Sequence, residues 1–201
     1  MEEGGSSLSD GGIPHSGQEN SVPVYLIRSF INTREIAEGT DMLSSPELLR
    51  KWLAEAGLPG GSDAPDPGDL EWVIAIREAL RNVLQSHNDG SVPHASIGVL
   101  NRAARRAQVT IRFDPQGNPE IKATQDGVAG AVGTILAAVE QARVDGTWER
   151  LKACRREDCR WVFFDRSKNR SGTWCSTEGC GSLMKARAYR RRRATGKRQN
   201  E

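Results

Sequence analysis

All four cysteines of this chain lie within 27 residues, and none lies elsewhere. They are spaced C-x4-C-x15-C-x4-C, at Cys154, Cys159, Cys175 and Cys180. Two close pairs about 15–20 residues apart can aim four thiolates at one point, which is how a chain builds a tetrahedral zinc site. Two disulfides are the alternative, but they need an oxidising compartment, and nothing in the sequence indicates one. We therefore predict one structural zinc ion bound by these four cysteines.

The residues between and after the cysteine pairs predict a small module built on that metal. WVFFD at 161–165 is rich in β-branched and aromatic residues and indicates a short strand, and 165–172 has the composition of a turn. From residue 182 onward the helix formers meet no breaker before Gly196, which predicts a helix. Because so short a module has little other core, we expect three aromatic side chains to pack around the metal and not to stack on bases: Trp161, Phe163 and Trp174.

Charge is distributed very unevenly along the chain. Residues 1–149 carry 12 Lys+Arg and 21 Asp+Glu, a net charge of −9, whereas residues 150–201 carry 16 and 5, a net charge of +11. Four thiolates with one zinc ion lower the second value only to about +9. A basic end on an acidic body is typical of a chain that contacts a polyanion, and a solvated tail that maintains solubility is the alternative. The candidate nucleic-acid contacts are Lys168, Arg170, Lys185, Arg187, Arg190, Arg191, Arg192 and Arg193.

The predicted C-terminal helix favours phosphate contacts over base reading. Successive helical residues turn by about 100°, so its six cations surround most of the helix, and only the first turn is apolar enough to pack on a scaffold. A dedicated major-groove reader normally presents one defined polar face. We expect weak sequence preference and DNA in preference to RNA as the partner, although phosphate contacts alone do not discriminate between them.

The residues before the cysteines predict a mainly α body. Apolar periodicity and caps indicate helices at 44–57, 70–88, 95–108 and 127–144. Alternation on either side of DPQGNP indicates one β-hairpin, with strands at 109–113 and 120–123. We expect Ser45 and Asp69 to cap the first two of these helices, with a loop over 58–69. In the second helix the residues expected to point inward are Leu70, Val73, Ile76, Leu80 and Leu84. The small-residue helix at 127–144 is expected to pack closely on its neighbours.

No catalytic constellation emerges, and we expect the protein not to be an enzyme. The glycines at 127–133 imitate a phosphate loop but lack a following Lys-Ser/Thr. His87 and His94 are expected at the surface. Four acidic residues are expected on solvated helix faces without visible partners: Glu71, Glu78, Asp126 and Glu140.

The expected fold class is mainly α: a multihelical N-terminal domain with one small β-hairpin, followed by a four-cysteine zinc finger that ends in a basic helix. We predict a disordered acidic Gly/Ser-rich tail at 1–22, a helical domain at 23–146, the finger at 147–193 and a disordered basic tail at 194–201. The two folded parts are expected to unfold separately. No apolar run approaches 18 residues and the N-terminus lacks a signal-peptide pattern, so a cytoplasmic protein without membrane contact is expected.

The motifs resemble a known family. C-x4-C, WVFFDRSKNRS, TWCS, and CG ahead of KARAYRRRR are similar to the CGNR zinc finger, and SFINTRE at 29–35 resembles the entry to the ABATE domain that usually precedes it. The resemblance covers about residues 23–193 and implies zinc binding and a role as a stress-induced transcription regulator. Two departures stand out. Ser182 and Leu183 replace the Asn and Arg of CGNR, and Ser29 replaces an Asp of the N-terminal motif.

The leading hypothesis is a zinc-binding transcription regulator that contacts nucleic acid through its basic finger. The N-terminal domain would then serve as an interaction module or sense a small-molecule effector. The alternative is a protein-interaction or structural module, in which zinc is purely structural and the basic helix is a solvated tail.

Overall fold

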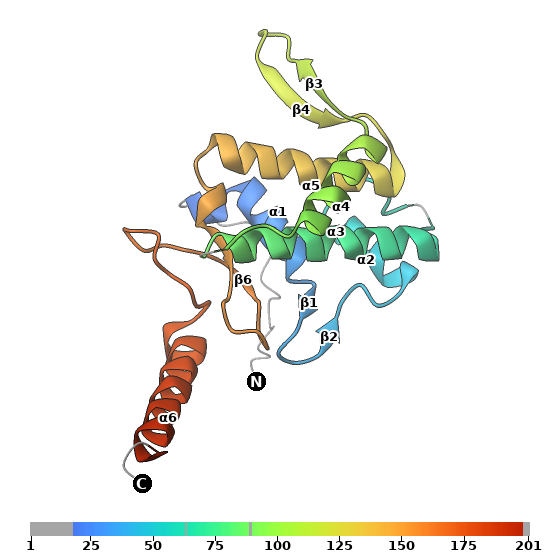
Figure 1. Cartoon of the computed structure of the whole chain (residues 1–201). Helices are drawn as coiled ribbons and strands as arrows, with labels where there is room; N and C mark the ends of the chain where they lie inside the picture. Colours follow the sequence, from blue (N-terminus) through green and yellow to red (C-terminus); the bar gives the residue numbers. More distant parts are fainter. Residues whose placement is uncertain (1–17, 63, 89, 199–201) are drawn as a thin grey trace, which may run out of the picture.

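The computed structural model describes residues 18–62, 64–88 and 90–198. Figure 1 shows a helical body, one hairpin that projects from it, and a last helix that extends away at the opposite end. The α-helices are α1 (Val22–Ile31), α2 (Pro46–Glu55), α3 (Pro67–Ser86), α4 (His94–Arg106), α5 (Gly127–Val144) and α6 (Ser182–Arg198). The shorter helical turns are η1 (Gln18–Asn20), η2 (Trp148–Arg150) and η3 (Thr177–Gly181).

Three separate two-stranded antiparallel sheets complete the described part of the chain. Their strands are β1 (Arg34–Glu35) with β2 (Thr40–Asp41), β3 (Val109–Phe113) with β4 (Pro119–Ala123), and β5 (Leu151–Ala153) with β6 (Val162–Phe164). The mainly α fold class is therefore confirmed. None of the helices in the described ranges is long and apolar enough to cross a membrane.

Most predicted elements are present, but several boundaries differ. The side chain of Ser45 caps α2 as predicted. Helix α3 begins at Pro67, earlier than predicted, because Asp66 is its N-cap and forms a reciprocal capping box with Asp69. Helix α6 continues to Arg198, past Gly196, which is the first helix breaker in the sequence of this segment. Of the predicted N-terminal tail, residues 1–17 lie outside the described residues, while η1 and the start of α1 occupy the rest.

The core of the body lies where α1, α3 and α5 meet. Helix α1 packs on α5 and α3, and α3 also packs on α4 and α2. The apolar residues predicted to point inward from α3 are buried, except that Leu70 is only partly buried against the same core. The sequence pattern therefore predicts the packed face of α3 correctly.

Helix α5 uses small residues to approach its neighbours closely, as predicted. A Cβ at Gly133 would overlap the Cβ of Ala123 at the base of the β3–β4 hairpin. A Cβ at Gly130 would overlap the carbonyl oxygen of Gln125. Both glycines are therefore required for packing, which explains the glycine spacing without a phosphate loop.

Two fully buried arginines of α3, which the sequence pattern does not predict, join the body together. The guanidinium of Arg77 donates to both carboxylate oxygens of Asp41 at 2.7 Å. Arg81 donates to the carbonyl oxygens of Ile31 at 2.6 Å and of Arg160 at 2.9 Å. Glu78 forms ion pairs with both arginines, so the expectation that Glu78 lies on a solvated face without a partner is wrong.

The β5–β6 hairpin belongs to the core of the body. Leu151, Ala153 and Val162 are fully buried in the same apolar cluster as residues of α1 and α3. At the end of α3, His87 Nδ1 donates to Leu151 O at 2.8 Å and the side-chain amide of Asn88 donates to Ala153 O at 2.8 Å. The first hairpin of the predicted finger therefore packs into the core of the body.

The two histidines of the described ranges differ in their surroundings. His94 is exposed, as expected. His87 is half-buried against Trp148, and burial lowers its pKa, although the bond to Leu151 opposes that effect. The surface prediction for His87 fails because its hydrogen-bond partner lies 64 residues further along the chain.

Candidate metal centre

Two tight turns bring the cysteine pairs together. The first turn closes the β5–β6 hairpin, where Cys154 N–H donates to Trp161 O and Cys159 N–H donates to Arg156 O, each at 2.9 Å. The second pair lies around η3, which Ser176 caps by accepting from Gly179 N–H at 3.0 Å. Hydrogen bonds donated by backbone N–H groups therefore hold both turns.

The four sulfur atoms all lie within 4.8 Å of one another. Cys175 Sγ is 3.8 Å from Cys159 Sγ and 3.6 Å from Cys180 Sγ. Regular tetrahedral coordination with Zn–S bonds of about 2.3 Å places sulfurs about 3.8 Å apart. All four cysteines are free thiols, so the disulfide alternative is not realised. The donor set fits one zinc ion and leaves no open position for a substrate, as in a structural site.

The pKa values of the clustered thiols indicate how a bound cation would affect them. Burial raises the pKa of Cys159 to about 11, and burial with the neighbouring Cys154 charge raises the pKa of Cys175 still further. Burial also opposes ionisation of Cys180, but hydrogen bonds from the other thiols and the charge of Arg156 lower its pKa. Without a metal, burial therefore opposes the thiolate forms of Cys159 and Cys175; a divalent cation removes that obstacle and displaces their protons.

Two of the three aromatic residues predicted around the metal are found there. Trp161 and Trp174 pack against the cysteine cluster. Phe163 does not, because alternation along β6 points Val162 and Phe164 towards the body core and Phe163 to the other face of the strand. Phe163 instead lines a cleft beside the finger.

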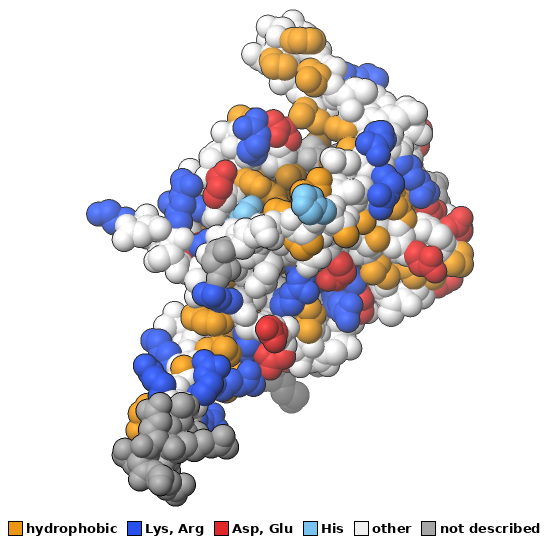
Figure 2. Space-filling view, viewed as in Figure 1, with side chains coloured by type: hydrophobic (Ala, Val, Ile, Leu, Met, Phe, Trp, Pro, Cys, Tyr) orange, Lys and Arg blue, Asp and Glu red, His pale blue; other side chains and the backbone are white. Residues whose placement is uncertain are grey.

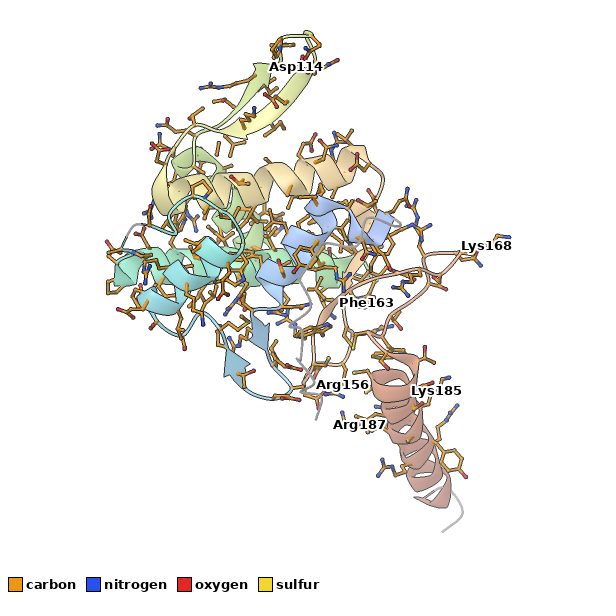
Figure 3. The ribbon with its side chains drawn as sticks, turned by 180° about the vertical axis from the view of Figure 1, so that it is seen from behind. Asp114, Arg156, Phe163, Lys168, Lys185 and Arg187 are labelled. Atoms are coloured by element: carbon orange, nitrogen blue, oxygen red, sulfur yellow. The ribbon has the colours of Figure 1, made fainter. Side chains whose placement is uncertain are left out.

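A buried ion pair holds the 165–172 turn. Lys152 Nζ donates to Asp165 Oδ2 at 2.8 Å and to the carbonyl oxygen of Arg170 at 2.5 Å, and both charged side chains are less than 5% exposed. Burial alone would raise the pKa of Asp165, but Lys152 and the N–H groups of Ser167 and Gly172 outweigh it and hold the pKa at about 2. The turn is therefore a rigid platform, and Lys168 points outward from its tip (Figure 3).

We expect Asp165→Asn to lower the free energy of unfolding by about 3–5 kcal/mol at neutral pH, because Lys152 would remain buried without a counter-charge. The folded pKa of about 2 lies below the ordinary 3.8, so the carboxylate stabilises the fold above about pH 4, and this contribution is lost as the pH falls towards 2. Urea unfolding of both proteins at each pH should show the difference shrinking in acid. A difference that does not change with pH would contradict this account.

Asn32 links the N-terminal body directly to the finger. Its side-chain amide donates to Val162 O at 2.9 Å, and its Oδ1 accepts from Val162 N–H at 2.8 Å. Asn32 lies in the SFINTRE segment, so the resemblance marks the residue but gives it no role. The structure shows that it completes the hydrogen bonding of β6, across 130 residues of sequence.

The candidate nucleic-acid contacts form two exposed groups on the same side of the body (Figures 1 and 3). One group is the 165–172 turn, where Arg170 lies 3.9 Å from Glu149 and Lys168 has no charged partner among the described residues. The other is α6, whose exposed cations are Lys185, Arg187, Arg190, Arg191 and Arg192. The side chain of Arg193 lies outside the described residues.

Helix α6 is attached to the finger at its start. Arg187 lies 3.4 Å from Asp158 Oδ2 in the first cysteine turn. Ser182, one of the departures from CGNR, donates to Thr177 O at 3.1 Å, and Leu183 beside it is half-buried. On the face that Figure 2 shows, Lys and Arg side chains lie on both sides of the coloured part of the helix, with hydrophobic side chains between them.

The fold and the site together define a class: a helical body whose core includes the first hairpin of a C-terminal four-cysteine zinc finger, which ends in a projecting basic helix. Comparison with family models agrees. The ABATE model, described as "Putative stress-induced transcription regulator", matches residues 26–150, and the CGNR zinc finger model matches residues 150–193. The chain belongs to the ABATE family and carries a CGNR zinc finger. No curated protein matches the chain significantly.

Proposed function

We propose that this protein is a transcription regulator that contacts nucleic acid, DNA rather than RNA, through the basic side chains of its zinc finger. The observation that carries this proposal is the position of the cations. Lys168 and five cations of α6 are exposed on two projections from the finger, while the metal and the Lys152–Asp165 pair fix both projections at their bases. The stress-related role rests on the family description.

The arrangement supports binding to phosphate more than reading of bases. The exposed cations of α6 lie around the helix instead of along one face, and no Asn or Gln stands among Lys185–Arg192. Cations of this kind neutralise phosphates and release counterions, so affinity falls as salt rises. We propose a binding role without catalysis, because the cysteines are committed to the metal. We also propose that the protein acts in the cytoplasm, where thiols stay reduced.

We expect Lys185→Ala, Arg190→Ala and Arg192→Ala together to reduce the log–log salt slope for duplex DNA by about two to three, since each lost phosphate contact removes about 0.9. Fluorescence anisotropy across a salt series measures the slope, and metal analysis should still give one zinc per chain. The matched control removes three exposed arginines from the body, Arg50, Arg102 and Arg112, and should leave the slope unchanged.

If the α6 variant binds DNA as the parent does, or if the body control weakens binding equally, α6 is not the contact surface. The alternative function, a protein-interaction module with a purely structural zinc and a solvated basic helix, would then stand.

We also propose that the N-terminal domain serves as the effector-sensing or interaction module. A mostly apolar groove of about 510 Å³ lies between α1, α5 and the β3–β4 hairpin, where Ile111 is 66% exposed. A thermal-shift screen of small apolar compounds tests the effector role, and Ala137→Trp, which would fill the groove, should remove any shift. A shift that persists in this variant would place the ligand elsewhere.

A further inference from the structure

A second cleft lies where α1 meets the zinc finger, apart from the exposed cations of α6. It measures about 450 Å³ and is lined by Arg28 from α1, Phe163 from β6, Arg166 from the turn and Trp174 beside the cysteines. Hydroxyl groups of Ser167, Ser176 and Thr177 also line it. The cleft is therefore formed jointly by the ABATE segment and the finger.

Arg28 is the unusual member of this cleft. Its Nε is buried and has no hydrogen-bond partner among the described residues. The other charged groups that line the cleft are compensated, because Arg166 pairs with Glu19, and Asp165 pairs with Lys152. The rest of this half-buried side chain lines the cleft and forms no ion pair with a described residue. An anion in the cleft would pair with the terminal nitrogens of the Arg28 guanidinium.

The remaining walls indicate what kind of anion fits. Phe163 and Trp174 line the cleft, and Trp174 also packs against the cysteine cluster and beside Gly181, where a Cβ would come within 3.3 Å of the indole. The hydroxyls can donate to an anion, because Ser167 and Ser176 use their oxygens to accept from backbone N–H groups and keep their protons available. A guanidinium, hydroxyls and aromatic surfaces together suit a phosphate joined to a flat ring.

We propose that this cleft binds a phosphate-bearing nucleotide, with the phosphate at Arg28 and the base against Phe163 and Trp174, which departs from the expectation that these rings do not stack on bases. The proposal rests on the proposed function for the choice of a nucleotide over another aromatic phosphate. The nucleotide is either one unit of a bound nucleic acid or a free mononucleotide. Because the cleft has walls from both family segments, occupancy would tighten the contact between the body and the finger.

The test uses the zinc-loaded full chain and isothermal titration with three probes: adenosine monophosphate, inorganic phosphate and a single-stranded tetranucleotide. Adenosine monophosphate should bind more tightly than inorganic phosphate, which cannot contact the rings. Arg28→Ala should weaken adenosine monophosphate about 10- to 100-fold, as expected for the loss of a charged hydrogen bond. The matched control Arg50→Ala removes the same charge from an exposed position on α2 and should bind as the parent does.

A second variant keeps the test decisive if Arg28→Ala does not fold. Thr177→Asp places a carboxylate in the cleft from an exposed position and should weaken binding to a similar extent. A tetranucleotide that binds more tightly than adenosine monophosphate, and loses affinity in both variants, identifies nucleic acid as the source. Equal affinities identify a free nucleotide.

The proposal is overturned if adenosine monophosphate does not bind at millimolar concentration, or if it binds the parent and both variants equally. The proposed function fails in a different experiment, if duplex DNA binding does not depend on α6. That result is independent of whether the mononucleotide binds.

Discussion

Arg81→Ala is expected to lower the free energy of unfolding by about 3–5 kcal/mol, because the substitution removes a fully buried cation and leaves its partners without donors. The guanidinium of Arg81 donates to Ile31 O, to Arg160 O and to Glu78, so it joins α1, α3 and the first cysteine turn at one point. Urea unfolding at neutral pH measures the change.

The matched control for this variant is Arg102→Ala, at an exposed position on α4, which should change the free energy of unfolding by less than about 0.5 kcal/mol. Zinc affinity provides a second readout, because Arg81 bonds to the backbone of the first cysteine turn. Equal stabilities of the two variants would show that the buried arginine does not connect the body to the finger.

Cys175→Ser is expected to reduce zinc from one ion per chain to a small fraction, because the closed four-thiolate site loses a ligand. The near-UV signal of Trp161 and Trp174 should be lost with it, since both pack on the cysteine cluster. Most of the far-UV helical signal should remain at low temperature, but the melting temperature of the whole chain should fall, because β5 and β6 lie in the core of the body.

Ser171→Ala, at an exposed position in the neighbouring turn, should keep one zinc per chain and the parent's melting temperature. If Cys175→Ser retained stoichiometric zinc, the four-cysteine site would be wrong. If its body melted as the parent does, the finger strands would not contribute to the core of the body.

Local signals were sufficient to predict much of this fold. The periodicity of Val73, Ile76, Leu80 and Leu84 identifies the packed face of α3, and the alternation on either side of DPQGNP identifies the β3–β4 hairpin. These features depend on residues close together in sequence, so a pattern with a period of 3.6 or 2 carries them. The cysteine spacing acts in the same way, because all four ligands lie within 27 residues of sequence.

Features that depend on distant residues could not be predicted from such patterns. In the sequence, Arg77 and Arg81 cannot be told apart from exposed cations of a helix. Their burial depends on hydrogen bonds to Asp41, Ile31 and Arg160, which are distant in sequence. Strand β5 could not be predicted either, because a strand of three residues is too short to show an alternating pattern.

The sequence predicts the metal ligands and the cations of the candidate site, but not the contacts that hold them in place. The four cysteines and the exposed cations followed from spacing and charge, whereas the Lys152–Asp165 pair and the Arg28 cleft needed coordinates. A lysine and an aspartate 13 residues apart give no sign in sequence that they will meet in a buried turn.

The most direct test of the central claim is the affinity of the zinc-loaded chain for duplex DNA measured from low to high salt. We predict a linear fall of log affinity with log salt, with a slope of about 3 to 5 in magnitude, as expected when four or five cations of the finger contact phosphates. Removal of zinc by a chelator should weaken this binding, because α6 would lose its anchor at the cysteine turns. Absence of binding at low salt, or an affinity independent of salt and zinc, would contradict the account.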